Sequence, residues 1–129
     1  MLFRSIGEIL VHRRTETKDV FPGAYDVFAG GVCATGESYE ACASREVTEE
    51  LGVVLPGLRR LFKHRYRGTQ SQAWGAVYVA RWDGAVRPQE SEVAWHAWIA
   101  PERLDRMLVE LPFCPDSLEI FARVRQQGS

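Results

Sequence analysis

The strongest constraint on this chain is a set of fixed residue types between Gly31 and Val53. Gly31 is followed after five residues by Glu37, and after seven more by the segment 45–53, which reads Arg-Glu-Val-Thr-Glu-Glu-Leu-Gly-Val. Such a combination of glycines, glutamates and one arginine at set spacing is far more specific than a lone glycine-rich loop. The rest of the chain must therefore fold so that the charged side chains of this stretch can act together.

The sequence predicts a helix over residues 39–51 of this stretch. Ser38 is suited to cap it, because the serine oxygen can accept a hydrogen bond from a free amide of the first turn. No glycine or proline occurs from Tyr39 to Leu51. Gly52 is suited to end the helix in the left-handed conformation. The segment is therefore expected to form a loop, a helix and a second loop.

The predicted helix would place three glutamates along one edge, because residues three and four apart are neighbours on a helix surface. They are Glu46, Glu49 and Glu50. Three glutamates alone are more often a solvated acidic face. A divalent cation such as Mg²⁺ changes repulsion between them into attraction, since it takes oxygen ligands and shares its coordination with substrate phosphates. An apolar stripe turned away from the glutamates is suited to pack on a sheet; it comprises Ala43, Val47 and Leu51.

The complete pattern matches the Nudix box without a departure, and the chain resembles the Nudix hydrolases. The resemblance implies an α/β fold, an α/β/α sandwich in which helices flank a mixed β-sheet, with the box forming loop, helix and loop. We expect one Nudix domain over residues 1–129. The resemblance also implies cleavage of a diphosphate linkage in a nucleoside diphosphate derivative or nucleotide, by attack of water on phosphorus, with Mg²⁺ or Mn²⁺ as cofactor.

The resemblance also implies roles for individual residues of the box. Glu46, Glu49 and Glu50 match the metal ligands, and the carbonyl of Gly31 completes the metal site in the family pattern. Glu46 and Glu49 are also candidates for the catalytic set, because one ligand glutamate can help to deprotonate water. Arg45 matches a catalytic-site residue that, with Glu37, orients these glutamates through ion pairs.

A basic segment before the box suggests a site for the substrate diphosphate. Arg14 and Lys18 precede a Pro-Gly pair in a pattern that resembles the Nudix subgroup containing isopentenyl-diphosphate isomerase. In that subgroup these two positions contact the diphosphate, and an arginine can bind phosphate in a bidentate manner. The isomerase also needs a cysteine just before the box, where this chain has Gly30. The isomerase activity therefore remains an alternative, as does a non-catalytic nucleotide-binding Nudix module.

Three carboxylates outside the box are candidates for the same site. Nudix hydrolases often carry a further glutamate before the strand expected at 94–99, and Glu92 fits this position best, with Glu90 second. The proton acceptor in the reaction is therefore either Glu49 or Glu92. Asp26 is expected near the site, where a structural role is as reasonable as a functional one.

Composition narrows the range of partners and compartments. The net charge of −1 gives no general attraction to nucleic acid or to an acidic membrane surface. No apolar run approaches the length of about 18 residues that a membrane span requires. The three cysteines are an odd number without metal-type spacing, which argues against a disulfide framework and favours a cytoplasmic location. The expected partner is a small-molecule diphosphate substrate, without nucleic acid or membrane, and a homodimer stays open.

Apolar and turn residues predict the remaining elements. A hairpin is expected at the start of the chain, with its second strand at 9–12. Further strands are expected at 25–28, 58–66, 72–82 and 94–99, with a turn at 68–71. The strand at 72–82 has apolar residues on both faces, which is typical of a central strand. Helices are expected at 101–109 and, over about ten residues, from the Pro-Asp-Ser segment that begins at residue 115.

Overall fold

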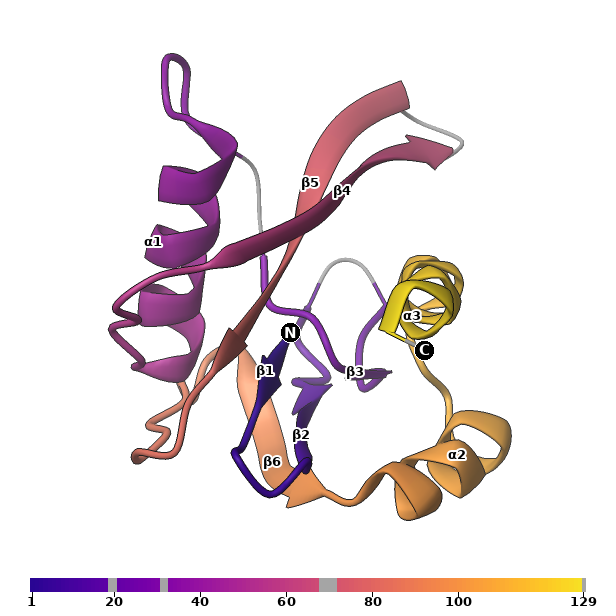
Figure 1. Ribbon diagram of the computed structural model, residues 1–129. Helices are drawn as coiled ribbons and strands as arrows, with labels where there is room; N and C mark the ends of the chain where they lie inside the picture. The colour runs from indigo at the N-terminus through magenta and orange to yellow at the C-terminus, as the bar shows by residue number, and fades with distance from the viewer. Residues whose placement is uncertain (19–20, 31–32, 68–71, 129) are drawn as a thin grey trace.

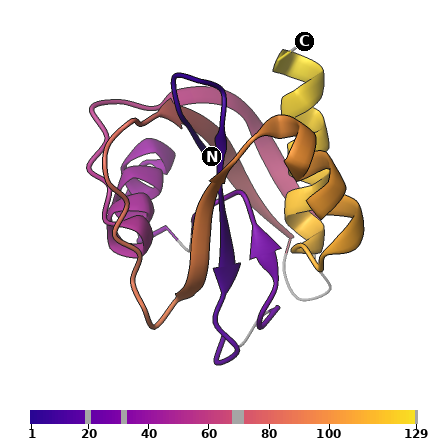
Figure 2. The same cartoon turned by 90° about the horizontal axis from the view of Figure 1, so that it is seen from below.

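The computed structural model describes residues 1–18, 21–30, 33–67 and 72–128, and it shows a mixed β-sheet with helices on both faces (Figure 1). The described strands are β1 (Leu2–Phe3), β2 (Ile9–Arg14), β3 (Tyr25–Asp26), β4 (Arg59–Arg67), β5 (Gln72–Arg81) and β6 (Val93–Ile99). The described helices are α1 (Tyr39–Leu51), α2 (Pro101–Glu110) and α3 (Pro115–Gly128). Figure 2 shows α1 on one side of the sheet and α2 and α3 on the other, which confirms the predicted α/β/α sandwich.

The sheet combines antiparallel and parallel neighbours. Its strand order is β3-β2-β1-β5-β4, and β6 pairs with β2 outside this path. The parallel contact joins β1 to β5, whereas β4 and β5 form a long antiparallel pair. Strand β5 has neighbours on both sides, as its two apolar faces predict. The predicted turn at 68–71 lies outside the described residues.

Two apolar clusters hold the helices against the two faces of the sheet. Alternate residues of a strand point to opposite faces, so Leu10 packs towards α1 while Val11 packs towards α2 and α3. On the α1 side, Leu10 meets the buried Val47 and Leu51 of the predicted apolar stripe. The stripe therefore fixes the rotation of α1 about its axis, and this rotation decides where the glutamate edge points.

Strand β3 is shorter than the sequence predicts. It covers two residues instead of the expected segment 25–28. The carboxylate of Asp26 accepts a hydrogen bond from the amide of Phe28 at 2.9 Å. Such a local bond from an aspartate side chain to the backbone replaces the pairing that would continue the strand. The chain leaves the sheet here and turns towards the box.

The ends of α1 agree with the prediction. Ser38 accepts from the amide of Ala41 at 3.1 Å, and Gly52 follows the helix in the left-handed conformation with φ 65°. A Cβ atom on Gly52 would lie 2.5 Å from the carbonyl oxygen of Arg87. Gly52 is therefore required both for its backbone angle and for the close approach of the segment around Arg87.

We expect Gly52→Ala to lower the free energy of unfolding by roughly 2–4 kcal/mol, because strain in the left-handed region is added to a steric clash. Gly36→Ala is a matched control, since Gly36 also has a positive φ, of 82°, but has open space around it. The control should lose only about 1–2 kcal/mol. Urea unfolding of both variants measures the difference, and equal losses would contradict the steric argument.

None of the helices in the described part of the chain combines the length and the apolar character that a membrane crossing requires.

Candidate active site

The loop before α1 is held to the helix through an ion pair between Glu37 and Arg45. The Arg45 guanidinium donates from Nε and Nη2 to the two carboxylate oxygens of Glu37, at 2.9 and 3.0 Å. Glu37 also accepts from the backbone amide of Ala34 at 3.0 Å. These donors, with Arg45 contributing most, lower the pKa of Glu37 to about 2, and the same ion pair raises the pKa of Arg45. The loop and the helix are therefore connected by a charge-assisted, bidentate contact.

Arg45 also reaches two of the three box glutamates. Its Nη1 atom donates to Glu46 at 3.0 Å and to Glu49 at 3.2 Å. The Glu46 side chain is 12% exposed, whereas that of Glu49 is 53% exposed. Glu46 thus lies at the inner end of the glutamate edge and Glu49 on its rim. Arg45 thus contacts Glu37, Glu46 and Glu49, and its orienting role in the reaction stays a prediction.

The third box glutamate, Glu50, has a strongly shifted pKa. Burial raises its pKa to about 7, and the negative charges of Glu46 and Glu92 act in the same direction. The positive charges of Lys18 and Arg14 act against them. Glu50 therefore lies within reach of charges to which the sequence assigns three separate roles. These roles are metal binding, diphosphate binding and proton transfer.

Backbone pairing explains how residues far apart in sequence come together here. Strand β2 pairs with β6 so that Arg14 lies opposite Val93. The segment before β6 is also tied to the end of α1, since the amide of Gln89 donates to the carbonyl of Glu50 at 2.8 Å. These contacts bring Glu92 to Lys18, and the two side chains form an ion pair. The second candidate, Glu90, is exposed in the same segment.

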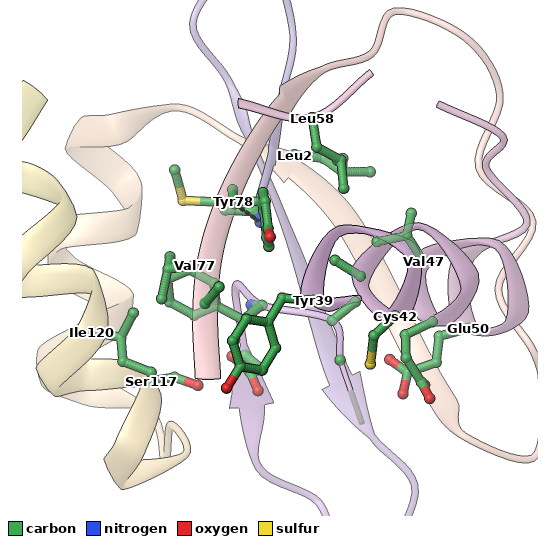
Figure 3. Close-up of a pocket in the computed structure, with 18 of the residues that line it drawn as sticks. Leu2, Tyr39, Cys42, Val47, Glu50, Leu58, Val77, Tyr78, Ser117 and Ile120 are labelled. Atoms are coloured by element: carbon green, nitrogen blue, oxygen red, sulfur yellow. Dashed lines mark hydrogen bonds between the residues drawn. The ribbon is translucent and has the colours of Figure 1, made fainter. Parts of the chain in front are cut away.

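A cavity of about 560 Å³ adjoins the glutamate edge of α1. In Figure 3 the Cys42 and Glu50 side chains extend from α1, while Ser117 and Ile120 of α3 lie on the opposite side. The wall also includes charged and aromatic residues from several elements: Arg14, Asp26, Phe28, Tyr39, Glu46 and Tyr78. Sequence reasoning does not assign Tyr39, Tyr78 or Ser117 to this space. For Ser117 the sequence offers one signal, the Pro-Asp-Ser segment at the start of α3, which by itself indicates a helix cap and a subgroup resemblance.

Asp26 lines the cavity but is held by structural contacts. Besides the amide of Phe28, it interacts with the buried thiol of Cys114. Burial and the Asp26 charge raise the pKa of Cys114 to about 12, so this thiol stays protonated and can donate to the carboxylate. A structural role for Asp26 accounts for these contacts without a role in catalysis.

The cysteines contradict the expectation that the chain lacks a disulfide. Cys33 and Cys42 form a disulfide, and their Cα atoms lie 5.3 Å apart. The reason is local, because the chain turns back between Ala34 and Glu37 and places Cys33 beside the first turns of α1. An argument from the total number of cysteines could not detect a pair brought together by one tight turn. Since the two sulfur atoms are bonded to each other, they do not serve as thiolate donors with the nearby Glu37.

The donor set fits a hard divalent cation. Glu46 and Glu50 supply carboxylate oxygens at the cavity wall, and their mutual repulsion contributes to the raised pKa of Glu50. A bound dication would relieve this repulsion, and oxygen-only ligands suit Mg²⁺ and Mn²⁺. Glu49 lies on the same helix edge. Gly31, the predicted carbonyl ligand, lies outside the described residues.

Comparison with known proteins agrees with this architecture. The family model described as NUDIX domain matches residues 1–124. A Nudix hydrolase of Streptomyces coelicolor is 50% identical over 121 residues, which cover 92% of this chain and 67% of the relative. A Nudix hydrolase of Pseudomonas aeruginosa is 40% identical over 119 residues, 92% of this chain and 70% of the relative. This chain thus spans about two thirds of the length of these relatives.

Solved structures show the same fold. DR0079 from Deinococcus radiodurans superimposes with a TM-score of 0.80 at 31% identity, over 95% of this chain and 77% of that one. The NUDIX domain of Shewanella oneidensis NrtR, solved with ADP ribose, has a TM-score of 0.75 at 20% identity, over 99% of this chain and 82% of that one.

The sandwich with an acidic loop-helix-loop at its cavity is the architecture of the Nudix class of proteins. The chain belongs to that class as a member of the Nudix hydrolase family. The resemblance to the isomerase subgroup is not tested by these comparisons and stays a prediction.

Proposed function

We propose that this protein is a divalent-metal-dependent hydrolase that cleaves the diphosphate linkage of a nucleoside diphosphate derivative or nucleotide. One observation carries the proposal: Glu46, Glu50 and Arg14 line one cavity, and Lys18 lies close enough for its charge to act on Glu50. Acidic side chains alone would repel a diphosphate. A divalent metal ion held by these carboxylates would, together with the positive charges of Arg14 and Lys18, change that repulsion into binding.

In this proposal Glu46, Glu49 and Glu50 hold the metal ion, together with the carbonyl predicted at Gly31. When bound there, Mg²⁺ or Mn²⁺ would supply charge neutralisation for diphosphate oxygens and a lowered pKa for a water molecule. Arg45 keeps the glutamates in position through its bonds to Glu46 and Glu49. The residues of the chain thus supply ligands and orientation rather than a covalent nucleophile.

Arg14 and Lys18 hold the phosphate groups that are not attacked. Arg14 lines the cavity, and Lys18 is paired with Glu92. A substrate phosphate that binds the Lys18 ammonium releases the Glu92 carboxylate, which can then accept a proton from the attacking water. Glu49 is the other candidate for proton acceptor, and variants of both residues separate the two.

The size and wall of the cavity support a nucleotide-derived substrate. A volume of about 560 Å³ lies within the range of roughly 300–1,000 Å³ that small-molecule sites usually have. Tyr39 and Tyr78 offer aromatic surface to a base. The ADP ribose bound by the NrtR domain is a nucleoside diphosphate derivative, which favours this substrate class for the present fold.

The alternative isomerase activity is disfavoured at one position. Gly30 stands where the isomerase needs a cysteine, and it lines the cavity without a side chain that could transfer a proton to carbon. Cys33 does not replace it, because its sulfur is bonded to Cys42.

The test is a screen of nucleotides and dinucleotide diphosphates with Mg²⁺ and with Mn²⁺, with product masses as the readout. We expect release of phosphate or of a nucleoside monophosphate, and loss of that release when EDTA is added. Binding without turnover across the screen would instead indicate a non-catalytic module. Rearrangement of isopentenyl diphosphate without release of phosphate would indicate the isomerase. Gel filtration of the same protein tests the homodimer, and cell fractionation tests the cytoplasmic location.

A further inference from the structure

The Cys33–Cys42 disulfide connects the two parts of the candidate metal site. Cys33 belongs to the loop that carries Glu37, and Cys42 is a buried residue of α1. Their Cα separation of 5.3 Å lies within the usual range for a disulfide, about 4.4–6.8 Å. The bond therefore needs no displacement of the backbone, and its formation ties the box loop to the box helix.

The pair lies directly beside the groups that orient the glutamates. Both cysteines line the cavity, and Cys42 precedes Glu46 by one helical turn. The Nη2 atom of Arg45 lies 4.0 Å from the Cys42 sulfur and also bonds to Glu37. The same guanidinium binds Glu46 through Nη1. Arg45 therefore lies between the disulfide and the carboxylates, and a change at the Cys42 sulfur can alter the contacts that Arg45 makes with Glu37 and Glu46.

We propose that Cys33 and Cys42 are a reversible thiol–disulfide switch that tunes metal binding at the box. In the disulfide form the loop is fixed to α1, so Glu37 meets Arg45 in the bidentate arrangement seen in the structure. In the dithiol form the loop is held only by its hydrogen bonds and the Glu37–Arg45 ion pair. The disulfide form is therefore the better organised one and binds a divalent cation more tightly.

The chemistry is ordinary thiol–disulfide exchange with an external dithiol as reductant. A thiolate of the reductant attacks the sulfur of Cys33, the less buried residue of the pair, the Cys33–Cys42 bond breaks, and Cys42 leaves as a thiolate beside the Arg45 guanidinium. The second thiolate of the reductant attacks the mixed disulfide and releases Cys33 as a thiolate. Each cysteine sulfur then takes a proton. The protein gains two electrons and two protons, and the reductant becomes a cyclic disulfide. Oxidation by a small disulfide follows the reverse path.

The first test measures the covalent change and the stability in wild-type protein. Alkylation after denaturation should label one cysteine in oxidised protein and three in reduced protein, since the chain has three cysteines. Closing so short a loop should raise the Tm of the oxidised form by roughly 5–10 °C. Equal Tm values, or three labelled cysteines after treatment with oxidised glutathione, would overturn the proposal.

The second test measures binding of Mn²⁺ by calorimetry, without any substrate. Reduction should raise the Kd for Mn²⁺ about tenfold, the lower end of the effect expected when groups that orient metal ligands lose their position. Cys33→Ser should show the reduced behaviour under both redox conditions. Cys114→Ser is the matched control, because Cys114 is the cysteine outside the disulfide, and it should keep the redox response. Equal or tighter Mn²⁺ binding by the reduced protein would overturn the switch.

The effect on metal binding rests on the metal site of the proposed function but not on its hydrolytic activity, and the disulfide and its effect on stability rest on neither. A redox-dependent Tm and Kd without turnover of any nucleotide would refute the proposed function and leave the switch intact. Turnover that is the same in both redox states, with the same Kd for Mn²⁺, would refute the switch and leave the hydrolase intact.

Discussion

Replacing Glu50 with glutamine should lower turnover by at least about 100-fold and, at the same time, stabilise the metal-free protein above pH 7. The loss of activity follows because Glu50 is a proposed metal ligand, and even groups that only orient such ligands change affinity or activity by about 10–100-fold. The gain in stability follows because the protein has to bury an ionised carboxyl group at this position, near Glu46 and Glu92.

The pH dependence of this gain has a definite sign. In unfolded protein Glu50 ionises near the ordinary glutamate pKa of 4.5, whereas in folded protein its pKa is about 7. Between these values the folded state holds a proton that the unfolded state has lost, so stability falls as pH rises through this window. The shift corresponds to at most about 3 kcal/mol, which is lost in full above pH 7. Glutamine resembles the protonated acid and avoids this loss.

Thermal unfolding of metal-free protein at pH 5 and at pH 8 measures the effect. Wild type and Glu50→Gln should have similar Tm values at pH 5, and the variant should be more stable at pH 8. Glu40→Gln is the control, since Glu40 is an exposed glutamate in the first turn of the same helix. Added Mn²⁺ should stabilise wild type and the control but not the variant. A variant less stable than wild type at pH 8 would contradict the placement of Glu50 among negative charges.

Glu49→Gln should lower turnover by about 10²–10⁴-fold with little change in stability. The range is that of general acid–base catalysis, and loss of a metal ligand acts in the same direction. The fold should survive because the Glu49 side chain is 53% exposed and its ion pair with Arg45 lies at the surface. The measurement is kcat under saturating Mg²⁺, with circular dichroism as the check on folding.

Glu92→Gln separates the two candidates for the proton acceptor. If Glu92 accepts the proton, Glu92→Gln should lower kcat and shift the acidic limb of the pH–rate profile. The Glu49 variant should then lose both kcat and affinity for the metal ion. If Glu49 accepts it, Glu92→Gln should mainly change KM through the loss of its partner at Lys18. Turnover at the wild-type level in Glu49→Gln would remove this residue from the mechanism.

Much of the fold follows from local sequence signals. The sequence predicts helix α1 with the bounds that the structure shows, because Ser38 and Gly52 mark its two ends through their own backbone groups. It also predicts the central position of β5, since apolar residues on both faces of a strand need cover on both sides. The predicted strand β3 is too long because one aspartate side chain competes with the backbone pairing.

The site is only partly predictable for a physical reason. The identity of the charges at Glu46, Glu49 and Glu50 follows from the sequence, because their spacing on one helix determines that they share an edge. The disulfide between Cys33 and Cys42 does not follow from the sequence. It depends on a turn of the backbone between the two cysteines, which the spacing of the cysteines does not predict.

The sequence by itself determined a capped helix with a row of carboxylates, and with it the family and the class of reaction. Only the tertiary structure decided which distant groups meet that row. The pairing of β2 with β6 and the packing of residues 87–92 against the end of α1 bring Lys18 and Glu92 to Glu50. Helix spacing is a local property of consecutive residues, whereas strand pairing depends on the burial of both faces of the sheet by the whole chain.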